Sequence, residues 1–218
     1  MEVYNFAKKP SIVNQYVAEI RDITVHGDAL RFRRNIERVG EIVAYEISKT
    51  LTYKQAEVST PLAKAQVDLL GEDVVLATVL RAGLPFHQGF LNVFDKAGNA
   101  FVSAYRKYRR DHASFEIQVE YLSTPSLEGK TLILVDPMLA TGGSLEMAYK
   151  ALLSKGEPAK IHVAAVISSK KGINTIKNVF PKEKTTVWTA AIDADLDEHA
   201  YIVPGIGDAG DLAYGEKL

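Results

Sequence analysis

Short runs of branched apolar residues alternate along the chain with longer segments of helical periodicity. The apolar runs predict buried strands at 74–80, 100–105, 132–135, 161–167 and 185–190. The periodic segments predict helices at 11–26, 28–50, 86–94, 144–155 and 170–179. Strands that alternate with helices in this way are typical of an α/β fold with a mostly parallel sheet flanked by helices.

One segment departs from this pattern. From Phe115 to Leu122, apolar and polar residues alternate with a period of two, which predicts a half-exposed antiparallel hairpin. We therefore expect an arm that protrudes from the main sheet over about 107–130. Because the chain has no internal repeat, low-complexity tract or linker, we predict a single domain over residues 1–218.

Polar or glycine-bearing turns follow three of the predicted strands. Arg81 follows the strand at 74–80, Arg106 follows that at 100–105, and Asp136 follows that at 132–135. Parallel α/β sheets bind ligands at the carboxyl ends of their strands, so these residues are candidates for one site. A cation after a buried strand needs either a carboxylate partner or an anionic ligand, and the pattern leaves both open for each arginine.

The turn after the strand at 132–135 has the composition of a phosphate cradle. It passes from Asp136 through Thr141, Gly142, Gly143 and Ser144 into a predicted helix. Glycines allow close backbone approach, and the N–H groups at a helix start attract anions. Asp136 is placed to bind hydroxyls or a cation beside the phosphate, although a helix N-cap is the plainer alternative.

Two other phosphate motifs are false matches. The sequence at 129–131 reads Gly-Lys-Thr like the end of a P-loop, but it precedes a strand and lacks the first glycine. Residues 205–210 match G-x-G-x-x-G, yet the βαβ unit that a dinucleotide needs does not follow. A glycine-rich tail bearing an acid can still act as the lid of a pocket.

Composition narrows the class of protein. The chain has 218 residues, is 47% hydrophobic and 24% charged, carries a net charge of −1 and has no cysteine. These values are typical of a soluble globular protein and exclude disulfides and thiolate chemistry. The charge argues against a nucleic-acid coat or a membrane-surface role, and no signal peptide is visible, so we expect a cytoplasmic protein with no nucleic-acid or membrane partner.

Three motifs together resemble the uracil phosphoribosyltransferase family. The stretch 135–144, Val-Asp-Pro-Met-Leu-Ala-Thr-Gly-Gly-Ser, is similar to that family's phosphoribosyl-diphosphate loop. Residues 80–84 resemble its pyrophosphate loop, and residues 201–211 resemble its uracil-binding tail. Other phosphoribosyltransferases have a second acid where this chain has Pro137, which favours the uracil-specific branch over purine, orotate and RNA-binding relatives.

The resemblance implies the type I phosphoribosyltransferase fold with a C-terminal hood over about 191–218. It implies the reaction of uracil with phosphoribosyl diphosphate to UMP and diphosphate, in pyrimidine salvage, with Mg²⁺ held mainly through the substrate. The implied catalytic residues are Asp136, Arg81 and Arg106. The implied phosphoribosyl-diphosphate site comprises Arg81, Arg106, Asp136, Pro137, Met138, Leu139, Ala140, Thr141, Gly142, Gly143, Ser144 and Asp208. The implied uracil site comprises Ile202, Gly207, Asp208 and Ala209.

Several expectations accompany this interpretation. GTP is a candidate effector, and we expect a homodimer or a larger homo-oligomer because the helix at 28–50 and the arm both offer surface to bury. One alternative is a regulatory protein that uses the same pocket as a nucleotide sensor and binds RNA. Another is an enzyme of the same class with a different base specificity.

Overall fold

The computed structural model describes the backbone of residues 1–108 and 115–216. Side chains are described for residues 1–103 and 120–216. At its centre is a twisted sheet whose strands were mostly visible in the sequence. Across the sheet the order is β1 (Glu2–Asn5), β10 (Thr185–Asp193), β9 (Lys160–Ser169), β7 (Thr131–Val135), β4 (Val74–Val79), β5 (Gly98–Tyr108) and β6 (Phe115–Ser123), with β8 (Met138–Leu139) also paired to β9. All of these pairs are parallel except β5 with β6.

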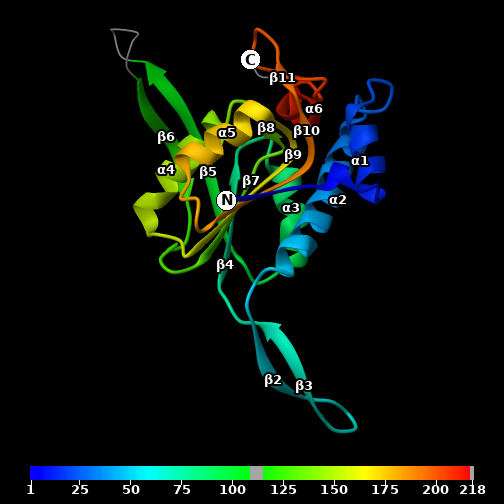
Figure 1. Cartoon of the computed structure of the whole chain (residues 1–218), viewed down its shortest axis with the longest axis vertical. Helices are drawn as coiled ribbons and strands as arrows, with labels where there is room; N and C mark the ends of the chain where they lie inside the picture. Colours follow the sequence, from blue (N-terminus) through cyan, green and yellow to red (C-terminus); the bar gives the residue numbers. More distant parts are fainter. Residues whose placement is uncertain (109–114, 217–218) are drawn as a thin grey trace.

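Helices cover both faces of the sheet (Figure 1). One face packs against α1 (Ile12–Arg21), α2 (Ala29–Ser48) and α3 (Leu84–Val93). The other packs against α4 (Gly143–Leu152) and α5 (Lys170–Val179). Alternate residues of β7 serve the two cores, with Leu132 and Leu134 on one face and Ile133 and Val135 on the other. The predicted α/β fold is therefore confirmed.

Two hairpins extend this frame. The antiparallel pair predicted within 107–130 exists as β5 and β6, but it begins inside the sheet at Gly98, and residues 109–114 lie outside the described chain. A second hairpin, β2 (Tyr53–Ser59) with β3 (Lys64–Leu70), projects from the opposite end of the molecule and was not predicted (Figure 1). Among the described residues no helix is long and apolar enough to cross a membrane.

The C-terminal segment folds over the carboxyl end of the sheet (Figure 1). It contains the short pair β11 (Asp195–Leu196) and β12 (Ile202–Val203), followed by α6 (Ala209–Tyr214). Ile202, Ile206 and Ala209 anchor it in the same core as α1 to α3. We call residues 195–216 the hood. The predicted limits of the single domain, 1–218, and of its arm, about 107–130, remain predictions. Two 3-10 turns complete the elements, at Phe6–Lys8 and Leu153–Lys155.

Candidate active site

A cleft of about 270 Å³ lies between the ends of β4 and β7 and the hood. Strand β7 is central in the sheet, between β9 and β4, so its end is the point where the turns after β4 and β7 meet. Nine of the predicted site residues line this cleft: Arg81, Asp136, Met138, Ala140, Ser144, Ile202, Gly207, Asp208 and Ala209. Segments up to about 130 residues apart thus form one site.

Asp136 is buried at the end of β7. Its backbone N–H continues the sheet by donating to the carbonyl of Ala164 at 3.1 Å. Its side chain is 7% exposed, and its Oδ1 accepts from the backbone N–H of Met138 at 3.4 Å. Burial raises the pKa of Asp136 to about 7 because the low-dielectric surroundings disfavour the charged form. The acid thus has a protonation equilibrium in the neutral range and lines the cleft.

The phosphate-cradle turn is held from behind by α5. The carbonyl oxygen of Ala140 accepts from Ser169 Oγ at 2.5 Å, and that of Thr141 accepts from Thr175 Oγ1 at 2.7 Å. Gly142 has a φ of +84° and precedes the first turn of α4, where Ser144 lines the cleft. Two carbonyls of the turn are thus bonded to Ser169, the N-cap of α5, and to Thr175 within α5. The N-terminus of α4 lies at the cleft in the arrangement that binds anions.

Other residues of this turn shape it without lining the cleft. The carbonyl of Pro137 accepts from the N–H groups of Val166 and Ile167, at 3.1 and 3.0 Å, and Leu139 is fully buried where β8 pairs with β9. Thr141, Gly142 and Gly143 follow, and Thr141 Oγ1 accepts from the N–H of Gly143 at 3.3 Å. The side chain of Leu139 therefore belongs to the core.

Arg81 has a carboxylate partner in the hood. It follows a cis peptide bond with Leu80, and its Nη2 donates to Asp211 Oδ1 at 3.3 Å and to the carbonyl of Gly215 at 3.0 Å. Its Nε is buried and has no partner among the described residues. The sequence allowed either a carboxylate or an anionic ligand as the partner of Arg81, and the structure shows a carboxylate. Through this contact the arginine joins the turn at 80–84 to the hood.

Arg106 occupies a defined backbone position only. It lies in β5, opposite Ile117 of β6, and its side chain falls outside the described part of the chain. Its proposed role as a ligand of diphosphate stays a prediction.

In the hood, Asp208 is the N-cap of α6. Its Oδ1 accepts from the N–H groups of Gly210 and Asp211 at 2.8 and 3.0 Å. Ile202 is 3% exposed, with its side chain in the core, so contacts from this residue to a ligand come from its backbone. Gly207 has a φ of +80° and is exposed at the cleft.

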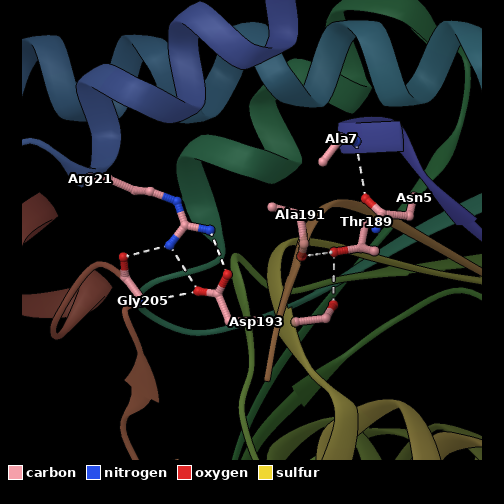
Figure 2. A network of polar contacts seen from close by, with 8 residues as sticks. Asn5, Ala7, Arg21, Thr189, Ala191, Asp193 and Gly205 are labelled. Atoms are coloured by element: carbon pink, nitrogen blue, oxygen red, sulfur yellow. Dashed lines mark hydrogen bonds and ion pairs between the residues drawn. The ribbon is translucent and has the colours of Figure 1, made fainter. Parts of the chain in front are cut away.

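The sequence did not indicate a polar network beneath the hood. Arg21, at the end of α1, bonds to Asp193, at the end of β10, and both bond to Gly205 (Figure 2). Asp193 could have been found by reasoning similar to that for Asp136, since it is an acid at the end of a buried strand. Arg21 carries no such signal, because its partner is 172 residues away.

Comparison with known proteins gives concordant matches. The family model for uracil phosphoribosyltransferase matches residues 7–216. A curated uracil phosphoribosyltransferase of Porphyromonas gingivalis is 58% identical over 218 residues, covering 100% of both chains. One from Pyrococcus furiosus is 36% identical over 219 residues, covering 99% of this chain and 91% of its own.

Solved structures share the fold. A protein from Aquifex aeolicus aligns with a TM-score of 0.84 at 29% identity, with 98% of each chain covered. The orotate phosphoribosyltransferase of Mycobacterium tuberculosis, solved with 5-phospho-α-D-ribosyl 1-diphosphate, aligns with a TM-score of 0.50 at 12% identity. That alignment covers 87% of this chain and 94% of the other, and at this identity it bears on the fold alone.

Proposed function

The chain belongs to the uracil phosphoribosyltransferase family, and we propose on that basis that its cleft transfers the phosphoribosyl group of phosphoribosyl diphosphate to uracil. The products are UMP and diphosphate, which makes the protein a pentosyltransferase of pyrimidine salvage. The observation that carries the proposal is that the cradle, the buried acid and the hood line the same cleft. In the reaction the bond from C1 of ribose to diphosphate breaks, a bond from N1 of uracil to C1 forms, and the N1 proton is released.

The phosphate cradle is the proposed site of the 5′-phosphate. Residues 140–144 include the N-terminus of α4 and the hydroxyls of Thr141 and Ser144. Of this turn, Met138, Ala140 and Ser144 line the cleft. The bonds from Ser169 and Thr175 support this role, because they fix the turn before the ligand arrives. Pro137 and Leu139 contribute by holding the turn against β9.

Asp136 is proposed to act on the ribose. As a carboxylate it accepts hydrogen bonds from the ribose hydroxyls and favours the positive charge that develops on the sugar as the C1–O bond breaks. Because burial raises its pKa to about 7, the ionised form needed for this role increases as the pH rises through neutrality. Positioning and electrostatics, rather than a strong general base, supply the rate enhancement in this proposal.

Arg81 and Arg106 are the proposed ligands of diphosphate. Two guanidinium groups neutralise charge that grows on the leaving group in the transition state. Arg81 must exchange its contacts to Asp211 and Gly215 for diphosphate oxygens, and its 39% exposed side chain allows that exchange.

The hood is the proposed site of uracil. Backbone groups of Ile202, Gly207 and Ala209 read the amide edge of the base, and Asp208 lies between the base and the phosphoribosyl group. An exocyclic amine in place of O4 reverses one hydrogen bond, and a buried polar group without a partner costs about 1–3 kcal/mol. We therefore expect cytosine to be rejected.

Magnesium fits this site through the substrate. Mg²⁺ prefers phosphate oxygens, water and one or two carboxylates to an all-protein cage. The described residues include no cluster of three or more His, Cys, Asp or Glu side chains. Asp136 would be the carboxylate that holds the ion beside the proposed ribose position, and diphosphate oxygens would supply other ligands. The ion would neutralise charge on the diphosphate.

The remaining proposals concern the whole protein: a homo-oligomer, cytoplasmic localisation, GTP as an effector, and no nucleic-acid or membrane partner. Turnover with and without GTP tests the effector. The alternative of an RNA-binding regulator predicts tight, salt-dependent binding to pyrimidine-operon leader RNA, which filter binding at physiological salt measures.

The decisive experiment is a turnover assay with phosphoribosyl diphosphate, Mg²⁺ and a panel of uracil, cytosine, hypoxanthine, guanine and orotate. We expect nucleotide product with uracil and at least about tenfold lower kcat/KM with cytosine. Product with another base but not with uracil supports the alternative specificity. No UMP formation overturns the proposal.

A further inference from the structure

An ion pair between the ends of α1 and β10 also bonds to a residue of the hood (Figure 2). Arg21, the last residue of α1, donates through Nη1 to Asp193 Oδ2 and through Nη2 to Asp193 Oδ1, both at 2.8 Å. This two-bond geometry between a guanidinium and a carboxylate is the most directional form of ion pair in proteins. It fixes the end of α1 relative to the end of β10.

The same pair holds both sides of one hood residue. Gly205 donates its N–H to Asp193 Oδ2 at 3.0 Å, and its carbonyl accepts from Arg21 Nη1 at 2.9 Å. Gly205 has a φ of +56°, and an added Cβ would lie 1.9 Å from the carbonyl oxygen of Ile202. The turn is therefore tightly specified, and we call Arg21, Asp193 and Gly205 the hood clamp.

The side chains of the hood clamp are mostly removed from solvent. Asp193 is 7% exposed, and the side chain of Arg21 is 23% exposed. A buried ion pair adds little net stability compared with apolar packing, but its fixed geometry can specify one arrangement of the chain. Arg21 itself stands on a well-anchored helix, since α1 begins with a capping box at Ser11 and buries Val13, Val17 and Ile20.

The clamp holds the hood between two residues of the proposed uracil site. Gly205 follows Ile202 by three residues and precedes Gly207 by two, and both of those residues line the cleft. We infer that Arg21 and Asp193 are positioning residues for the nucleobase, an inference that rests on the proposed function. They fix the backbone of the hood in the position where it hydrogen-bonds to uracil. Arg21, at the end of α1, thereby contributes to base recognition without contacting the base.

The test uses Arg21→Met, with Arg31→Met as its matched control. Arg31 also makes a two-bond ion pair with a carboxylate of α1, through Nε and Nη2 to Glu19 at 2.9 and 3.0 Å. Among the described residues its side-chain bonds go only to Glu19, so the control removes an arginine from the same region and spares the hood. Arg21→Lys and Asp193→Asn, which keep more of the side-chain volume, serve if Arg21→Met does not fold.

Two readouts separate positioning from general stability. In steady-state kinetics we expect Arg21→Met to raise the KM for uracil by at least about tenfold, with the KM for phosphoribosyl diphosphate within about twofold of wild type. In hydrogen exchange on the ligand-free proteins we expect amides at 201–208 to exchange at least about tenfold faster, with the strands of the sheet unchanged. Arg31→Met should leave both readouts near wild type.

The outcomes distinguish this inference from the proposed function. If wild type makes no UMP but Arg21→Met still loosens 201–208, the proposed function fails while the clamp stands as a structural coupling. If Arg21→Met, Arg21→Lys and Asp193→Asn all leave the KM for uracil unchanged, or raise both KM values equally, the positioning role is overturned.

Discussion

The protonation of Asp136 couples stability to function at a single residue. Its pKa is raised from 3.8 to about 7 because the side chain is buried without a cation among the described residues beside it. Between these two values the unfolded state ionises while the folded state holds its proton, so stability falls as the pH rises and levels off above about 7.

Asp136→Asn is therefore expected to stabilise the folded protein and to lower its catalytic activity. At pH 8 the variant gains up to about 4 kcal/mol in the free energy of unfolding, and the gain shrinks as the pH falls to 5. Its kcat/KM falls at least about tenfold, whereas wild-type kcat/KM rises with pH up to about 7. Urea unfolding at the two pH values and a pH–rate profile measure these effects. A variant with wild-type turnover would remove Asp136 from the proposed chemistry.

Asp208 has a structural role that its sequence position concealed. As the N-cap of α6 it stabilises the hood, so Asp208→Ala loses the cap, worth about 1 kcal/mol, together with any contact to substrate. Asp208→Asn keeps the cap. We expect both variants to lower kcat/KM for uracil at least about tenfold, and only Asp208→Ala to lower the thermal midpoint. If Asp208→Asn turns over like wild type, capping is the whole role of this residue.

At the scale of elements, the phosphate cradle depends on α5. Gly142→Ala places a Cβ 2.8 Å from the Cβ of Thr175, whose hydroxyl bonds to Thr141. Gly129→Ala is the matched control, because Gly129 also has a positive φ, +69°, but open space around it. We expect both to lose about 1 kcal/mol of stability from backbone strain. Only Gly142→Ala should raise the KM for phosphoribosyl diphosphate, by at least about tenfold, with the KM for uracil little changed. Equal kinetics in the two variants would contradict the cradle assignment.

The sequence predicted those elements whose burial leaves a strong pattern. Strands buried on both faces, such as β4, β7 and β9, are continuous apolar runs, and α5 was predicted with its observed bounds. Hairpin β2–β3 was missed although polar and apolar residues alternate along both strands, at 55–59 and 64–69. None of its side chains is fully buried, so this weak alternation was not taken as a strand signal. Strand β1 was missed because its four residues are an exposed edge of the sheet.

In the candidate site, too, some features were predictable from the sequence and others were not. Asp136 was identified because it directly follows a buried strand, and Asp208 because it lies in a motif that resembles the family's uracil-binding tail. The contacts of Arg21 with Asp193, Arg81 with Asp211 and Thr175 with Thr141 join distant segments, and a single sequence carries no local trace of such pairs. These contacts are the ones that hold the cradle and the hood in place.

At the scale of the whole molecule, hairpin β2–β3 is the surface where we expect a second copy to bind. A two-stranded hairpin is marginally stable on its own, and this one projects away from the sheet (Figure 1). It also exposes large apolar side chains. Leu62 at its tip is 97% exposed, and Tyr53, Leu69 and Leu70 are 45%, 50% and 40% exposed. The sequence pattern had instead favoured helix 28–50 and the arm at 107–130 as the surfaces buried between copies.

Substitutions on hairpin β2–β3 and on α2 test which of these two surfaces forms the interface between copies. We expect wild type to sediment as a dimer or larger and Leu62→Asp to shift it toward monomer, because a charge buried at an interface is strongly unfavourable. Leu30→Asp, at a residue of α2 that is 64% exposed, is the matched control and should leave the assembly intact. Sedimentation velocity over a range of protein concentrations measures both. Dissociation by Leu30→Asp alone would place the interface on α2, and a monomeric wild type would exclude both surfaces.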